Sequence, residues 1–466
     1  MLFNSYVFCF LFLPATLAGW WLLPPGRPRL GFLTLASYFF YGWWDWRFVP
    51  LMLASTSADY LAGWYLGRVA VPSRRRAALV LLLGFNLGIL GVFKYYDFFA
   101  GTLNGLGRLL GTSPDLPLLH VVLPVGISFY TFNSISYTID IYRGRLAPAR
   151  TFLEFAAFVA MFPHLVAGPI VRYADLSPQF ARPQERRDAE WWVMGWWFFV
   201  VGMAKKVLLA DLLAAGFVTP LWHQIPQLDS GEAWLAVLAY TLQIYLDFSG
   251  YSDMAIGLAF LLGFRFPQNF DAPYQAPNIS EFWRRWHMSL SFWLRDYLYI
   301  PLGGNQGSRL RTLRNPVIVM FLGGLWHGAA WTFVIWGLYH GALLAVHAIC
   351  RRRGWVPGSR ALSVAATSLA VMVGWVFFRS GSLGDALRML RAMVGLGAGT
   401  GGNLALVGSP FAWVALALGL WLAWRLPDTW HLGVPRSRLA AIALALVLLM
   451  CVFRFATPSP FLYFQF

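Results

Sequence analysis

The chain has 466 residues, of which 58% are hydrophobic and only 12% are charged, whereas a soluble domain carries about 25% charged residues. This composition excludes an ordinary soluble domain and indicates lipid as the main solvent. The formal net charge of +16 comes from basic residues dispersed among apolar runs, which argues against nucleic-acid binding.

Uncharged apolar runs recur along the whole chain. Because roughly 20 apolar residues span a bilayer core, we predict an all-α polytopic membrane protein with about 11 transmembrane helices plus re-entrant or amphipathic helices. No separate soluble domain fits, so residues 1–466 are expected to form one integral-membrane domain. The first run lacks a basic leader and is interpreted as a retained helix. The runs cover residues 1–26, 77–93, 361–378, 404–424 and 439–453.

Arginine clusters predict the orientation of the chain. Arg27 and Arg29 follow the first run, and residues 74–76 follow the third. Since Lys and Arg collect in cytoplasmic loops, both clusters are expected inside and the N-terminus outside. A second interpretation is that some clusters also bind an anionic cytosolic ligand such as a nucleotide-bearing cofactor. Further cytoplasmic candidates are Arg143, Arg145, Arg150, Arg351, Arg352 and Arg353.

Asp247 and Asp253 interrupt an apolar run in the stretch "TLQIYLDFSGYSDMAIG", residues 241–257. Ionisable residues inside a membrane are costly and therefore functional candidates. One interpretation is structural: each carboxylate is hydrogen-bonded to a neighbouring helix or caps a break at Gly250. The other is that they bind the hydroxyl of an acceptor substrate.

The stretch "EFWRRWHMSLSFWLRDYLYIPLGGN", residues 281–305, is charged although apolar runs flank it. At helical spacing its polar side chains share one stripe, opposite Phe282, Trp286, Leu290 and Trp293. Such a two-faced helix suits a water-filled cavity wall or an interface, and periodicity leaves both open. Pro301 and two glycines then end it. The stripe comprises Arg284, His287, Ser291, Arg295 and Tyr299.

The stretch "GGLWHGAAW", residues 323–331, lies within a run from 315 to 350 that has no Asp, Glu, Lys or Arg. On one helix Gly323, Gly324 and Trp331 would share the face of His327. The glycines would let a backbone or a thin ligand approach the imidazole, and Trp331 would form a flat wall. A neutral imidazole in an apolar site suits a general base.

The remaining histidines, the cysteines and Ser289 are weaker candidates for a catalytic or ligand-binding role. The histidines lack i, i+4 ligand spacing and no HExxH or CxxC motif occurs, so no metal centre is expected. Three cysteines at apolar positions are assigned to packing, and Ser289 to lining. The remaining intramembrane histidines, interpreted as hydrogen-bonded core residues, are His120, His164, His340 and His347.

Several motifs resemble the membrane-bound O-acyltransferase superfamily, in particular its bacterial alginate O-acetyltransferase branch. They are "NISEFWRRWHMSLSFWLRDYLYIPLGGN", "GLWHGAAWTFVIWGLYHG", "LPVGISFYTFNSISYTIDIYRG", "FPHLVAGPIVRY", "QIYLDFSGYSDMAIG" and the terminal "PFLYFQF". The resemblance runs nearly end to end, with its core motifs within residues 120–345.

This resemblance implies a bacterial inner-membrane enzyme with a funnel on each face that meets near a catalytic histidine. His327 matches the family's near-invariant histidine, and His287 matches its second polar position. The implied reaction transfers an acetyl group from a cytoplasmic thioester, acetyl-CoA or a relative, to an exported polysaccharide, commonly through periplasmic or membrane-anchored partner proteins. No bound cofactor is implied.

Roles follow from this chemistry. His327 would take the proton of the attacking hydroxyl, and His287 would orient the donor or stabilise negative charge. Arg284, Arg285 and Arg295 would attract a phosphate of the donor; for Arg284 and Arg285 the alternative is pairing with Glu281, one turn before them. Within the superfamily the alternative is D-alanyl transfer to teichoic acid. Outside it, the alternative is a transporter or flippase without acyl chemistry.

Overall fold

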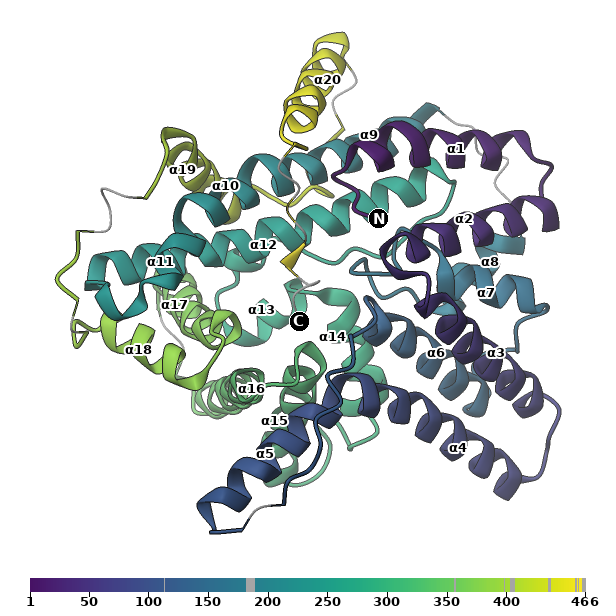
Figure 1. The fold of residues 1–466 in the computed structure, drawn as a ribbon, viewed down its shortest axis with the longest axis horizontal. Coiled ribbons are helices and arrows are strands. Elements are labelled where there is room, and N and C mark those ends of the chain that lie inside the picture. The colour runs from purple at the N-terminus through teal and green to yellow at the C-terminus, as the bar shows by residue number, and fades with distance from the viewer. Residues whose placement is uncertain are drawn as a thin grey trace. The chain divides into compact units, whose positions relative to one another are not determined.

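The computed structural model describes residues 1–112, 114–181, 189–355, 358–397, 399–402, 407–434, 437–456, 459 and 461–462. Within these ranges the regular structure is helical and no β-strand occurs (Figure 1), which confirms the predicted all-α class. Most of the terminal motif at 460–466 lies outside them. The chain divides into two compact units, residues 1–195 with 258–267 (unit 1) and residues 196–257 with 268–466 (unit 2). The prediction of one membrane domain stays a prediction.

Unit 1 holds the first eight α-helices, and α9 (Ala189–Ala204) and α12 (Ser230–Leu261) each contribute residues to both units. Arg75 donates from its guanidinium to the carbonyl oxygens of Ile141 and Tyr142, at 3.2 and 3.0 Å. The first turn of α4 is thereby tied to the end of α6. The helices are α1 (Leu13–Leu22), α2 (Arg27–Asp45), α3 (Phe48–Leu66), α4 (Pro72–Leu90), α5 (Tyr96–Leu109), α6 (Ile127–Tyr142), α7 (Phe152–Ala160) and α8 (Tyr173–Ala181).

Unit 2 is built around the first part of α12, whose buried side chains share one hydrophobic core with residues of α16, α17, α18 and α19. Trp286, Trp336 and Trp375 are each at most 1% exposed in this core. Its helices are α10 (Asp211–Leu213), α11 (Thr219–His223), α13 (Ile279–Arg285), α14 (Met288–Leu294), α15 (Arg309–His327), α16 (Trp331–Arg352), α17 (Arg360–Arg379), α18 (Leu383–Met393), α19 (Pro410–Arg425) and α20 (Arg438–Phe453), with π-helical turns at Lys205–Ala210, Ala214–Val218 and Arg295–Tyr299.

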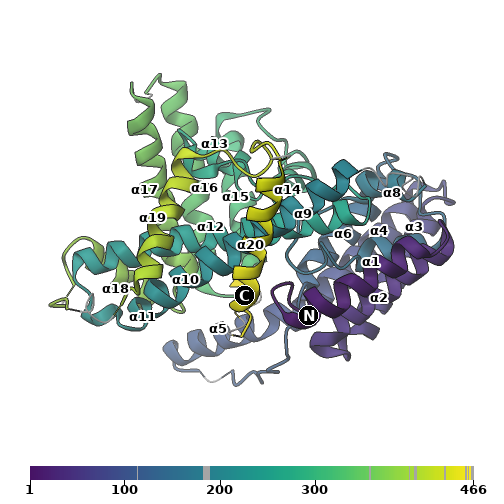
Figure 2. The ribbon, with the colours of Figure 1, turned by 90° about the horizontal axis from the view of Figure 1, so that it is seen from above.

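Glycines let α15 and α16 pack backbone to backbone, side by side in both ribbon views (Figures 1 and 2). A Cβ added to Gly324 would clash with the carbonyl oxygen of Phe333 and lie 3.2 Å from Cα of Gly337. One added to Gly341 would lie 2.7 Å from Cα of Val317. Small residues at such crossings are typical of helix pairs in membranes.

Two ion pairs hold the carboxylates that interrupt the apolar sequence of α12. Asp247 lies 2.6 Å from Lys206, and Asp253 lies 2.7 Å from Lys205. All four side chains are at most 14% exposed. Both carboxylates are thus bonded to a neighbouring helical segment, as one of the two interpretations predicted, but the predicted break at Gly250 is wrong. The helix continues through Gly250 because that glycine packs against the backbone of Gly202.

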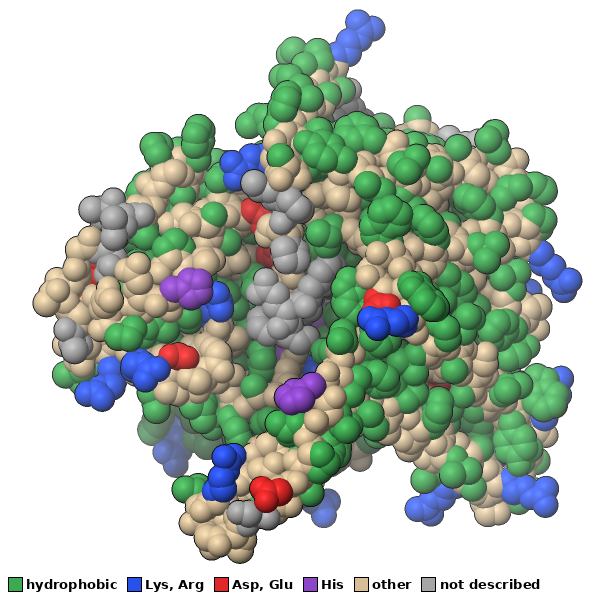
Figure 3. Space-filling view, viewed as in Figure 1, with side chains coloured by type: hydrophobic (Ala, Val, Ile, Leu, Met, Phe, Trp, Pro, Cys, Tyr) green, Lys and Arg blue, Asp and Glu red, His purple; other side chains and the backbone are tan. Residues whose placement is uncertain are grey.

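Three helical stretches among the described residues are long and apolar enough to cross a membrane: Pro72–Leu109, Trp331–Arg352 and Arg360–Arg379. Shorter apolar helices cover Phe8–Leu22, Pro410–Arg425 and Arg438–Phe453. Hydrophobic side chains cover much of the surface over α1 and α2 (Figure 3), as expected where lipid is the solvent. The expected number of about 11 spans stays a prediction.

Candidate active site

His287 sits at a break between two short helices. The prediction of one continuous helix over residues 284–299 is wrong, because α13 ends at Arg285 and α14 begins at Met288. His287 adopts the left-handed conformation, with φ of 44°, which is uncommon for a residue with a side chain. The break turns its imidazole inward, where the residue is 1% exposed.

Asn269 stabilises this break through both its backbone and its side chain. Its carbonyl oxygen accepts from the amide of Met288 at 2.9 Å. Its Oδ1 accepts from the amide and the hydroxyl of Ser289, at 3.3 and 2.8 Å, and lies 3.0 Å from Nδ1 of His287. Its Nδ2 donates to Ser252 at 3.0 Å.

This network defines the tautomer of His287. A backbone amide can only donate, so the Asn269 atom that meets Ser289 N is the oxygen. Nδ1 of His287 must therefore carry the proton that it donates to the same oxygen, and in the neutral ring the lone pair lies on Nε2. Among the described residues, no group is within hydrogen-bond distance of Nε2. Nε2 is thus positioned to accept a proton or a hydrogen bond from a substrate.

His327 is held by ring packing at the last residue of α15. Its ring meets those of Trp326, Trp336 and Phe378 edge to face, with centroids 4.9, 5.1 and 5.2 Å away. Gly328 then caps the helix with extended backbone, and α16 begins at Trp331. Trp331, 49% exposed, therefore does not share a helix face with His327, and that expectation is wrong. Gly324 lets the backbone of α16 come close. The sequence predicted that a backbone or a thin ligand would approach there, and the structure has the backbone.

Trp326 brings the two histidines into one site. Its indole lies 4.9 Å from the His327 ring and 6.1 Å from the His287 ring, between centroids. Trp326 and both histidines are at most 6% exposed. The site therefore has two buried imidazoles beside one aromatic wall, a setting suited to proton transfer with little water present.

The arginines of the expected polar stripe pair locally instead of facing the histidines. Arg284 and Arg285 bind the two carboxylate oxygens of Glu281, at 2.6 and 2.9 Å. The Arg285 hydrogen bond, helped by Arg284, holds the pKa of the Glu281 carboxyl below its usual value. Arg295 pairs with Asp296 at 2.6 Å. For Arg284 and Arg285 this is the pairing with Glu281 that the sequence left open, whereas the pairing of Arg295 with Asp296 was not predicted.

The side chains of two other site candidates bond to groups other than the two imidazoles. Ser291 donates to the Trp286 carbonyl oxygen at 3.3 Å, and Tyr299 ends the π-helical turn after α14. Besides its ion pair with Lys206, Asp247 accepts from the amide of Leu462 at 3.0 Å.

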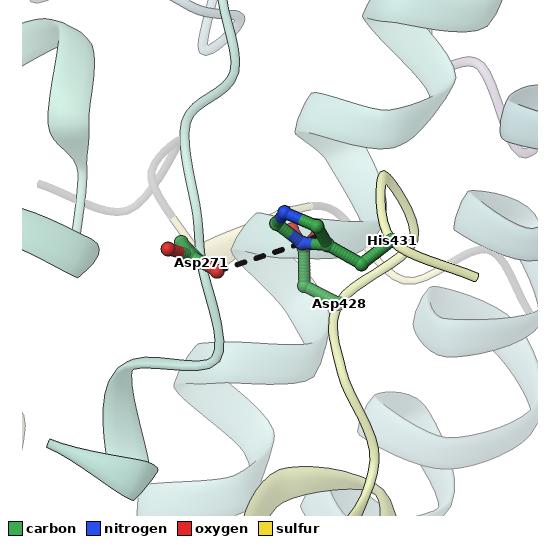
Figure 4. A group of neighbouring side chains, drawn as sticks. All are labelled: Asp271, Asp428 and His431. Carbon is green, nitrogen blue, oxygen red and sulfur yellow. Dashed lines mark ion pairs between the residues drawn. The ribbon is translucent and has the colours of Figure 1, made fainter.

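One group of described residues combines ligand types that metals use (Figure 4). Nδ1 of His431 lies 3.7 Å from Oδ1 of Asp271 and 3.3 Å from Oδ1 of Asp428. His431 and Asp271 are open to solvent, with side chains 58% and 38% exposed. These contacts are ion pairs when the imidazole is protonated. The group contains neither His287 nor His327.

Sequence reasoning missed Asn269 and Trp326. Asn269 precedes the charged stretch by twelve residues, and no helical period connects it to His287. Its signal is only a polar residue in the loop "FPQNFDAP". Trp326 adjoins His327 in sequence, yet as one of 24 tryptophans it is distinguished only by its contact with both imidazoles.

The chain is similar in sequence to known membrane-bound acyltransferases. Residues 150–376 match the model of MBOAT, the membrane-bound O-acyltransferase family. A probable alginate O-acetylase of Azotobacter vinelandii is 47% identical over 85% of this chain and 79% of its own length. A peptidoglycan O-acetyltransferase of Helicobacter pylori is 37% identical over 85% and 80%.

More distant is a teichoic acid D-alanyltransferase of Bacillus subtilis, 26% identical over 57% of this chain and 69% of its own length. The match to the family model spans α12, the His287 break and the α15–α16 pair. Together with the extended similarity to O-acetyltransferases, it shows that this chain belongs to the membrane-bound O-acyltransferase family.

Proposed function

We propose that this chain is an inner-membrane O-acetyltransferase that moves an acetyl group from a cytoplasmic thioester to hydroxyl groups of an exported polysaccharide. The observation that carries the proposal is the pair of buried histidines, His287 and His327, beside Trp326. Similarity to the two O-acetyltransferases favours acetyl over D-alanyl transfer, because the D-alanyltransferase is the more distant relative.

His327 acts as the general base. It takes the proton of the acceptor hydroxyl while the oxygen attacks the thioester carbonyl carbon. The new C–O bond forms, the C–S bond breaks, and the proton passes to the departing sulfur. A positioned base of this kind accelerates a reaction by roughly 10²- to 10⁴-fold.

His287 acts as a hydrogen-bond acceptor through Nε2. A neutral ring whose lone pair lies on Nε2 accepts a hydrogen bond but cannot donate one to an oxyanion. Of the two roles expected for His287, orienting the donor is therefore favoured over stabilising negative charge. Asn269 positions this ring through Nδ1.

Donor, partners and topology complete the proposal. Acetyl-CoA or a related acyl thioester is the donor, and periplasmic or membrane-anchored partner proteins carry the acetyl group onward to an alginate-like or other exopolysaccharide. We place the N-terminus outside, with about 11 spans and a funnel on each face. The contact of Arg75 with the end of α6 supports one part of this topology, that the arginine-rich stretches 74–76 and 143–145 lie on the same face of the membrane.

Mass analysis of the exported polymer tests the proposal. Cells with and without the protein would be compared for ester-linked acetyl and for ester-linked D-alanine. We expect acetyl esters to disappear from one exported polysaccharide when the protein is absent, with D-alanine unchanged. Loss of D-alanine instead would assign the superfamily alternative. An unchanged polymer that accumulates on the wrong side of the membrane would favour a transporter.

A further inference from the structure

We propose that unit 1 carries a binding site for an anionic phospholipid, with a phosphate pocket and an adjoining groove for an acyl chain. The pocket is a hollow of about 190 Å³, enough space for a phosphate group. Two segments far apart in sequence supply its basic residues, Arg27 and Arg29 after α1 and Arg150 before α7. Both segments belong to clusters that the sequence predicts at the cytoplasmic face.

Two of these arginines have uncompensated charge. Arg27 and Arg150 are exposed, and neither forms an ion pair with any acid among the described residues. The one acid that lines the pocket, Glu154, accepts a 2.6 Å hydrogen bond from the Tyr173 hydroxyl. Gln179, also in the wall, uses its amide on the backbone of Asp175 and Arg265. The pocket therefore has a net positive charge.

The backbone adds to this positive potential. α2 begins at Arg27 with no side-chain cap and no acidic residue in its first turn. Its amide groups favour a negative charge nearby. Arginines in the first turn oppose the helix dipole in an isolated protein, but an anion in the pocket would be stabilised by both. A phosphate therefore satisfies groups that otherwise repel one another.

Arg29 connects the pocket to an apolar groove. Its guanidinium donates to the Leu23 carbonyl oxygen at 2.9 Å and lies 5.3 and 5.4 Å from the ring centroids of Trp20 and Trp21. Trp20 lines the pocket, whereas Trp21 lines the groove, about 390 Å³ in volume. The other residues of the groove are Leu17, Ala18, Leu22 and Trp192.

The combination of a basic pocket and an apolar groove favours a phospholipid as the ligand. A nucleotide thioester or free phosphate would use the arginines alone, whereas a phospholipid would use both hollows. Basic pockets beside apolar helices recognise lipid head groups in this way, with about 1 kcal/mol for each basic residue near the surface. Removing Arg27 and Arg150 should therefore weaken lipid binding by about 10- to 30-fold.

Lipid titration of the purified, delipidated full chain tests the site. Phosphatidylglycerol, phosphatidylcholine, coenzyme A and inorganic phosphate would each be added, and bound lipid counted by native mass spectrometry. We expect tight, saturable binding of phosphatidylglycerol that phosphatidylcholine does not reproduce and that coenzyme A does not displace. The double variant Arg27→Gln/Arg150→Gln should bind this lipid about 10- to 30-fold more weakly, and Arg27→Lys/Arg150→Lys should largely retain binding.

The matched control is Arg351→Gln/Arg352→Gln, which removes the same charge from exposed positions at the end of α16. Equal binding by the two double glutamine variants would overturn the proposal. Displacement of phosphatidylglycerol by coenzyme A would assign the pocket to the donor nucleotide and also overturn it. Because the readout is bound lipid, its failure is separable from a failure of acetyl transfer.

Discussion

The two candidate catalytic histidines are oriented by different forces. His287 is held by hydrogen bonds at a strained break, where one asparagine bonds the imidazole and two neighbouring residues. His327 ends a regular helix and is held by three aromatic rings and by a helix pair packed through glycines. The difference teaches that one polar contact can fix a tautomer, whereas close ring packing on three sides can fix the position of a ring.

Trp326→Ala tests whether the two regions form one site, and it has the largest expected effect. Removing a buried tryptophan costs about 3–5 kcal/mol, and here it also removes the wall shared by both imidazoles. We expect a much lower melting temperature and loss of acetyl transfer at equal membrane abundance. Trp326→Phe, which keeps a ring, should retain part of both. Wild-type activity in Trp326→Ala would contradict the proposal that the two histidines form one site.

Asn269→Leu tests the hydrogen-bonded region. Loss of an orienting second partner typically lowers activity by roughly 10- to 100-fold, and we expect that loss here. Asn269→Asp keeps an acceptor for Nδ1, so it should restore the tautomer and raise the basicity of Nε2. Its pH–rate profile should therefore shift to higher pH, which a purely structural residue would not cause. Identical profiles and rates in Leu, Asp and wild type would refute the assigned role.

Gly324→Ala tests the packed region, with Gly323→Ala as its control one residue away. The added methyl at Gly324 meets the Phe333 carbonyl oxygen, whereas at Gly323 its nearest neighbour is Leu294 at 3.5 Å, an ordinary contact. Overpacking costs about 1–3 kcal/mol, so only Gly324→Ala should lower the melting temperature appreciably. Equal melting temperatures would mean that α15 and α16 are not this close.

Glu281→Gln tests the ion pairs of Glu281 with Arg284 and Arg285 on α13, the helix before the His287 break. It has the smallest expected effect. Solvent screens this pair, so the change should cost less than about 1 kcal/mol. Since the folded pKa of Glu281 lies below its ordinary value, its contribution is present above the ordinary pKa and is lost as pH falls through the lowered one. Denaturation of wild type and variant should converge at acid pH. A difference in stability between wild type and variant that grows as the pH falls would contradict this predicted pH dependence.

Much of the fold class was predictable, because apolar runs and a charge deficit are properties of composition. The bonding of Asp247 and Asp253 to a neighbouring helical segment was also predictable, because a carboxylate inside an apolar run needs a polar partner. Periodicity failed at His287 and Trp331, since a helical pattern cannot reveal a break that a distant residue stabilises. Asn269 acts through tertiary contact, and Trp331 lies beyond a cap formed by one extended glycine.

The most direct test of the central claim is acetylation by a His327→Gln variant. Ester-linked acetyl on the exported polymer would be measured by mass spectrometry in cells with equal amounts of wild type, His327→Gln and His347→Gln, a half-buried histidine of α16 outside the site. General-base loss predicts a decrease of roughly 10²- to 10⁴-fold for His327→Gln and wild-type acetylation for His347→Gln. Near wild-type acetylation by His327→Gln would contradict the account.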